Sequence, residues 1–207
     1  MRLHSRYNGY SKKELIVTVA TTTTLESINP ATGEVVGSVP VTSTEEISGI
    51  VAKARVAQSA WNGLGLDARV EMLKPVAKRL AEEGDRIGNL ITSEMGKSTK
   101  EAQGEASYGA DKFTIELEDA AQAFEPVEIA DENTTSMLYW DPLGVSAAIT
   151  PWNFPMLMPQ QCILPSIVAG NTVVFKPSEE TPLVGQAYAD ILNEVLPNDV
   201  LQVVHGA

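Results

Sequence analysis

Asn153 is a residue that could do chemistry, because Pro151 and Pro155 enclose it just after a short apolar run. The prolines restrict the backbone and remove two N–H donors, so we expect a rigid loop. A carboxamide held in such a loop is a neutral, directional hydrogen-bond donor, which suits a developing oxyanion. The alternative is that Asn153 is only a turn residue between the two prolines.

A second polar segment could hold a sugar, because Lys176 and Glu179 lie three residues apart directly after another apolar run. A lysine and a carboxylate at this spacing can both reach vicinal hydroxyls. A carboxylate that accepts a hydrogen bond from a ribose 2′-OH also repels a 2′-phosphate, and it therefore favours NAD over NADP. The alternative is a solvated, charged loop that binds no ligand.

Strand and helix patterns alternate around both segments. Their order is strand 144–149, helix 156–168, strand 172–175, a helix that Thr181 caps with Pro182 at its first position, and strand 200–204. This alternation predicts an α/β fold with part of a doubly wound, Rossmann-like parallel sheet. Ligands bind outside the carboxyl ends of the strands in such sheets, and Trp152, Asn153 and Lys176 fall at those ends.

The first half of the chain predicts a scaffold that packs against this sheet. The expected elements are a hairpin around the turn 29–34, a helix after Ser43, a helix capped by Asp67 and running through Leu80, a helix that ends at Gly96, a helix after Ser98, and strands at 127–129 and 136–140. The apolar stripes of the four helices are explained by packing alone.

Composition narrows the classes of function. The chain has 207 residues, a formal net charge of −12 and one cysteine. The acidic balance argues against binding to nucleic acid, and no apolar run reaches the roughly 18–20 residues of a membrane span. One cysteine excludes an internal disulfide framework and a four-cysteine zinc site, and we expect no metal site. We therefore expect a soluble, cytoplasmic, globular protein.

The N-terminal residues do not fit this globular pattern. Residues 1–10 are polar, and the apolar run 15–20 is too short for a convincing signal peptide. We expect residues 1–24 to be a non-native or disordered extension, with translation starting at Val17 or Val19 from an alternative start codon.

Taken together, the motifs resemble the aldehyde dehydrogenase superfamily. The resemblance covers about Leu25 to Ala207 and rests on segments that occur in the family's order, namely 28–34, 94–97, 151–155, 169–172 and 176–179. It implies a partial aldehyde dehydrogenase fold without the catalytic domain. Residues 25–126 would form the hairpin and helices of the NAD-binding domain, 127–141 the strands of an oligomerisation arm, and 142–207 the first half of the sheet. The general pattern is similar to that of semialdehyde-oxidising members.

The resemblance also implies roles for single residues. Asn153 matches the asparagine whose amide helps to stabilise the oxyanion of a thiohemiacetal. Lys176 and Glu179 match the pair that holds the adenosine ribose of NAD. The remaining cofactor-binding residues that match the family's motifs are Ile149, Thr150, Pro151, Trp152, Pro177 and Ser178.

The resembled reaction needs groups that this chain lacks. In the family a cysteine thiolate attacks the aldehyde and a glutamate activates water, and both lie beyond the segment that matches Lys176. Cys162 does not match the nucleophile, and we expect it to be a buried thiol of an apolar helix.

Two hypotheses follow from this difference. The first is the N-terminal piece of an NAD-dependent aldehyde dehydrogenase that forms a homo-oligomer when complete. The second is a non-catalytic protein of the same ancestry, which binds nucleotide weakly or joins full-length subunits through the arm.

Overall fold

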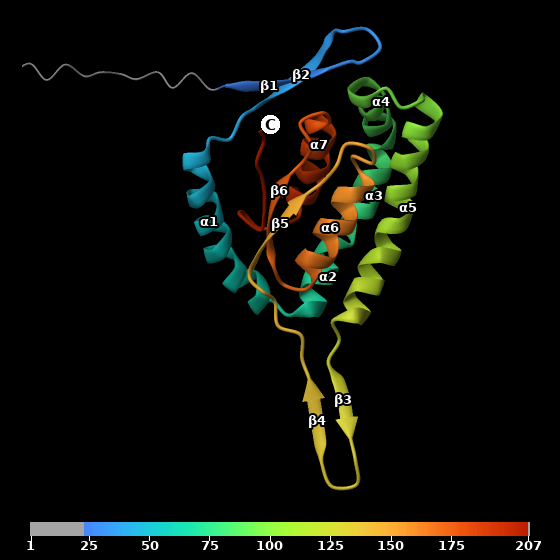
Figure 1. The fold of residues 1–207 in the computed structure, drawn as a ribbon. Coiled ribbons are helices and arrows are strands. Elements are labelled where there is room, and N and C mark those ends of the chain that lie inside the picture. Colours follow the sequence, from blue (N-terminus) through green and yellow to red (C-terminus); the bar gives the residue numbers. More distant parts are fainter. Residues whose placement is uncertain (1–22, 207) are drawn as a thin grey trace, which may run out of the picture.

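The computed structural model describes residues 23–206 and shows a mixed α/β fold (Figure 1). Its elements in chain order are β1 (Thr24–Ile28), β2 (Val35–Pro40), α1 (Thr44–Gly63), α2 (Leu66–Leu73), α3 (Pro75–Glu82), α4 (Gly84–Met95), α5 (Thr99–Ala123), β3 (Val127–Ala130), β4 (Thr135–Leu138), β5 (Val145–Ile149), α6 (Leu157–Val168), β6 (Thr172–Lys176), α7 (Pro182–Asn193) and β7 (Leu201–Val203). The expected N-terminal extension and its start codon fall almost wholly outside the described residues.

A three-stranded parallel sheet in the order β5-β6-β7 forms the centre of the molecule. The crossover helices α6 and α7 pack on one face, and α1 contacts all three strands from the other face (Figure 1). The sheet is therefore covered on both sides, as the alternating pattern predicted. No helix within the described part of the chain is both long and apolar enough to cross a membrane.

The helices α2 to α5 form a further layer over α6 and α7. The core cluster runs through both layers and includes Trp61, Phe113, Phe175 and Tyr188, all of which are buried.

α4 ends at Gly96, which adopts the predicted left-handed conformation with φ of 72°. Ser98 caps α5, where its hydroxyl accepts the N–H of Glu101, as expected.

The helix expected from Asp67 through Leu80 begins differently and is divided in two. Its N-cap is Gly65, at φ of 81°, so α2 starts at Leu66 and Asp67 lies in the first turn instead of capping it. Pro75 has no N–H to continue the hydrogen-bond ladder, and α3 begins there. The carboxylate of Asp67 remains at the positive end of the helix, where it is favourable.

Strands β3 and β4 form an antiparallel hairpin that projects from the body of the molecule (Figure 1). The carboxylate of Asp131 accepts the N–H groups of Asn133 and Thr134, at 2.8 Å each, and closes the turn. The second strand is shorter than expected, because β4 ends at Leu138, the partner of Val127. Pro126 precedes Val127 and offers no N–H for further pairing.

Cys162 is exposed, and its expected burial is wrong. α6 buries the side chains of Ile163, Leu164 and Ile167 against α5 and the sheet. Cys162 lies on the opposite side of the helix, because residues three and four apart share a helical face and its neighbours in sequence do not.

Candidate functional site

The parallel sheet brings the two polar segments side by side. Ile149, the last residue of β5, is in register with Lys176, the last residue of β6. The N–H of Thr150 donates to the carbonyl of Lys176 at 3.2 Å, so the two chains remain joined where they leave the sheet. The loops that carry Asn153 and Glu179 therefore start at one edge, where ligands bind in open α/β sheets.

The loop after β5 presents most of its side chains to solvent. Ile149 is 73% exposed and Trp152 is 50% exposed, and Pro151 and Asn153 are exposed as well. Thr150 is the exception, because its side chain is buried. The loop thus offers apolar surface and a carboxamide together, whereas Thr150 is buried and its N–H is already bonded to Lys176.

The loop after β6 holds a lysine and a carboxylate near each other. Lys176 Nζ lies 3.4 Å from Glu179 Oε2, and both side chains are partly exposed. Backbone hydrogen bonding and the Lys176 ammonium lower the pKa of Glu179, which keeps it ionised at neutral pH. Pro177 and Ser178 are buried and serve the packing of the loop.

A buried ion pair that sequence reasoning missed supports the Asn153 loop. Lys97 Nζ donates to Glu105 Oε2 and also to the backbone carbonyl of Asn153, at 2.9 Å. The other oxygen of Glu105 accepts the N–H of Met156 at 3.1 Å, at the start of α6. Glu105 therefore caps the helix that follows the loop.

A second buried glutamate does the same for α7. Glu94 accepts the N–H groups of Leu183 at 2.9 Å and Val184 at 2.8 Å. Thus Glu105 of α5 accepts N–H groups at the start of α6, and Glu94 of α4 accepts N–H groups at the start of α7. Helix N-termini at this edge of a sheet commonly bind phosphate, but these two are already capped by negative charge.

The far end of α6 is also held by side chains from other helices. Arg69 Nε donates to the carbonyl of Val168 at 3.1 Å, and Trp61 Nε1 donates to that of Ile167 at 2.9 Å. Burial lowers the pKa of the Arg69 guanidinium. A positive group at a helix C-terminus complements the helix dipole, so α6 is fixed at both ends by buried charges.

Burial raises the pKa of Glu94 above its usual value of 4.5, although the N–H groups of Leu183 and Val184 act in the opposite direction. A carboxyl group with a raised folded-state pKa stabilises the fold below its unfolded pKa, and this contribution is lost as pH rises through the folded pKa. Glutamine cannot ionise. We therefore expect the unfolding free energy of Glu94→Gln, relative to the wild type, to increase as pH rises from about 4.5 to neutrality.

Urea unfolding at a series of pH values measures this difference. Glu118→Gln changes an exposed glutamate of α5 and is the matched control. If the unfolding free energy of Glu94→Gln minus that of the wild type stays constant or falls as pH rises, the assignment is contradicted.

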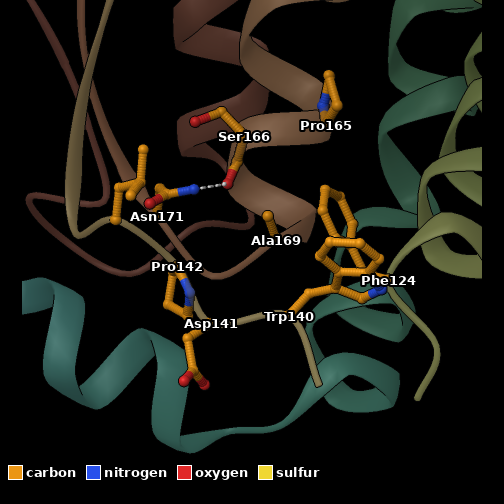
Figure 2. A pocket seen from close by; sticks show the side chains of 9 residues that line it. Phe124, Trp140, Asp141, Pro142, Pro165, Ser166, Ala169 and Asn171 are labelled. Carbon is orange, nitrogen blue, oxygen red and sulfur yellow. Dashed lines mark hydrogen bonds between the residues drawn. The ribbon is translucent and has the colours of Figure 1, made fainter. Parts of the chain in front are cut away.

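Two cavities lie near these elements. One of about 290 Å³ is at the base of the β3–β4 hairpin, where Phe124 and Trp140 approach the C-terminal end of α6 (Figure 2). None of the candidate site residues lines it. The other, of about 310 Å³, includes Trp152, Glu94 and Glu180 in its lining and adjoins the candidate loops.

Comparison with known proteins gives consistent matches. The sequence profile of the aldehyde dehydrogenase family matches residues 17–207. Malonate-semialdehyde dehydrogenase 3 of Geobacillus kaustophilus is 38% identical over 91% of this chain and 40% of its own length. Malonate-semialdehyde dehydrogenase 2 of Oceanobacillus iheyensis is 37% identical over 89% of this chain and 38% of its own length.

Solved structures match the fold. An NADP-dependent glyceraldehyde-3-phosphate dehydrogenase of Bacillus halodurans, complexed with NADP, superimposes with a TM-score of 0.83 and 31% identity, over 92% of this chain and 41% of that one. Succinate-semialdehyde dehydrogenase of Burkholderia pseudomallei has a TM-score of 0.82 and 32% identity, over 89% and 39%. The chain thus spans about 40% of the length of these relatives. With a profile match over most of its residues, this chain belongs to the aldehyde dehydrogenase family.

Proposed function

We propose that this chain supplies the cofactor-binding and oxyanion-stabilising part of an NAD(P)-dependent dehydrogenase that oxidises an aldehyde to a carboxylate. The observation that carries the proposal is the register of Ile149 with Lys176, which places the Asn153 loop and the Lys176–Glu179 pair at one sheet edge. The names of the malonate- and succinate-semialdehyde relatives favour a semialdehyde as the substrate.

The residues at this edge fit a dinucleotide. The carboxylate of Glu179 can accept hydrogen bonds from a ribose diol, and the Lys176 ammonium, which lies 3.4 Å from that carboxylate, can donate to the same diol. Exposed Ile149 and Trp152 offer apolar surface next to them. When bound, NAD supplies the hydride acceptor for the oxidation.

The chemical role that we assign to this chain is the binding of a developing negative charge. The side-chain amide of Asn153 would donate to the substrate oxygen as a cysteine thiolate attacks the carbonyl carbon. Pro151 and Pro155 limit the backbone motion of the donor, so little reorganisation is needed during the reaction. The thiolate and the glutamate that activates water would come from outside residues 1–207.

Spectrophotometric assay of the protein at its natural full length tests the proposal. We expect NAD(P)H to form with semialdehydes, and no oxidation by residues 1–207 alone.

The projecting β3–β4 hairpin supports a second candidate function, since it exposes Val127, Ile129 and Met137. On that alternative, which also allows weak nucleotide binding, the chain joins other subunits and the natural protein forms complexes without oxidising any aldehyde.

The preference between NAD and NADP is proposed to depend on Glu179. We expect Glu179→Ser to lower the ratio of kcat/KM for NAD to kcat/KM for NADP by about tenfold, because the variant no longer repels a 2′-phosphate. Steady-state kinetics with both cofactors measures the ratio. Glu180→Ser removes the neighbouring carboxylate and is the control, which should leave the ratio unchanged. If Glu179→Ser also leaves the ratio unchanged, the assignment of Glu179 is refuted.

We propose a cytoplasmic homo-oligomer that assembles through the β3–β4 hairpin and binds no nucleic acid. The formal net charge of −12 argues against nucleic-acid binding, and the single cysteine is typical of a reducing compartment.

A further inference from the structure

Lys97 contacts the Asn153 loop in two ways. Its ammonium donates to the backbone carbonyl of Asn153 at 2.9 Å and lies 4.4 Å from the centre of the Phe154 ring. The Lys97 side chain itself is only 13% exposed, whereas its partners Asn153 and Phe154 are exposed residues. Low exposure strengthens a charge-assisted hydrogen bond and a cation–π contact alike.

Glu105 extends these contacts to the next turn of the chain. Its carboxylate, only 2% exposed, accepts from Lys97 and from the N–H groups of Met156 at 3.1 Å and Leu157 at 3.4 Å. The two side chains thus hold four of the five residues from Asn153 to Leu157. The fifth is Pro155, which has no N–H to donate.

The carboxamide of Asn153 remains available for a ligand. Within residues 23–206 the hydrogen bonds to Asn153 go to its backbone carbonyl, and its side chain is exposed. The ion pair therefore fixes the backbone that carries the amide without occupying the amide itself. An oxyanion donor needs this combination, because a donor displaced by about 1 Å can lose up to about 10²-fold in rate.

We propose that Lys97 and Glu105 are positioning residues that hold the Asn153 carboxamide in its oxyanion-binding position. This inference rests on the proposed function, which makes Asn153 the oxyanion donor. Lys97 and Glu105 act through the loop and do not touch the reacting atoms. Their removal should therefore change the turnover step and the order of the loop, while the cofactor loop after β6 stays as it is.

Hydrogen exchange followed by mass spectrometry tests the loop directly, in the protein at its natural full length. In Lys97→Met and in Glu105→Gln we expect the amides of segment 152–157 to exchange about tenfold faster. The amides of β6 should keep their wild-type rates. Lys100→Met, which changes an exposed lysine of α5, is the control and should leave segment 152–157 unchanged.

Kinetics separates positioning from general stability. We expect Lys97→Met to lower kcat about tenfold with KM for NAD unchanged, and Lys97→Arg to recover part of the loss because it keeps the charge. In an Asn153→Ala background the Lys97→Met change should cost little further, since the donor it positions is gone. If the fold-losses of kcat from the two single changes multiply in the double variant, Lys97 does not act through Asn153.

The outcomes distinguish the two proposals. If Asn153→Ala leaves kcat unaltered, the oxyanion role fails, whatever the exchange experiment shows. If Asn153→Ala lowers kcat but Lys97→Met and Glu105→Gln change neither exchange of segment 152–157 nor kcat, the positioning role is overturned and the oxyanion role stands. A protein inactive at its natural length leaves exchange as the deciding measurement, and unchanged exchange again overturns the positioning role.

Discussion

Replacing Asn153 with alanine is expected to lower kcat by about 10²–10³, the cost of losing one oxyanion donor. The carboxamide is exposed at the carboxyl end of β5, and it would bind the substrate oxygen most strongly when that oxygen carries negative charge. The loss should therefore fall on kcat and on kcat/KM together, with KM for NAD unaltered. Steady-state kinetics of the protein at its natural full length measures these constants.

Asn89→Ala is the matched control for this prediction. Asn89 is an exposed asparagine within α4 and is not one of the candidate site residues, so its removal should leave kcat unaltered. Far-UV circular dichroism of both variants checks that the fold is retained. A kcat for Asn153→Ala within a factor of two or so of the control would remove Asn153 from the catalytic residues.

The sequence was sufficient to predict the strands and helices around the site, because their signals are local. Apolar runs of strand length flank each helical pattern, and Gly96 and Ser98 mark a helix end and a helix start. The parallel pairing of the strands then follows from the crossover helices α6 and α7, since parallel neighbours need such a connection. The placement of Asn153 and Lys176 at one edge required no further information.

The buried charges around the site could not be assigned from polarity alone. Glu94, Glu105 and Arg69 are charged residues within helices, which ordinarily face water. A usable signal was present, however, in their spacing. Glu94 follows the buried Ile91 by three residues, and Glu105 lies three residues after the buried Ala102. A charge on an apolar helical stripe indicates a buried partner, and only the tertiary structure shows which one.

Cys162 illustrates the opposite error. Its apolar neighbours in sequence suggested burial, but a helix turns by about 100° at each residue, so adjacent residues face different directions. The buried residues of α6 follow the stripe that contacts α5 and the sheet. Hydrophobic context in the sequence predicts the burial of a helix face and not of every residue in the helix.

The Lys176–Glu179 loop is held by a close contact between β6 and α7, and Gly185 makes that contact possible. A Cβ at position 185 would lie 2.4 Å from Cβ of Pro177 and 3.3 Å from Cζ of Phe175. Pro177 belongs to a rigid ring in the loop itself, so it cannot rotate away as a flexible side chain would. The methyl group must therefore move α7 or displace the loop.

Gly185→Ala is accordingly expected to lower the free energy of unfolding by about 1–3 kcal/mol, the cost of overpacking a core. Replacing glycine with alanine in a helix interior normally raises the free energy of unfolding by about 1 kcal/mol. At Gly185 we expect the opposite change, a decrease. Urea unfolding followed by circular dichroism measures the change. The displaced loop should also raise the KM for NAD, because Pro177 lies between Lys176 and Glu179.

Gly104→Ala provides the matched control, since Gly104 lies within α5 and, apart from its chain neighbours and the backbone of α5 itself, no heavy atom of the described residues comes within 4 Å of where an alanine methyl would lie. There the gain in helix propensity is unopposed, and we expect the free energy of unfolding to rise by about 0.5–1 kcal/mol. The two glycines thus differ only in what surrounds them, and the same substitution should act in opposite directions. Equal stabilisation by both variants would show that α7 has room to move and that the loop does not depend on Gly185.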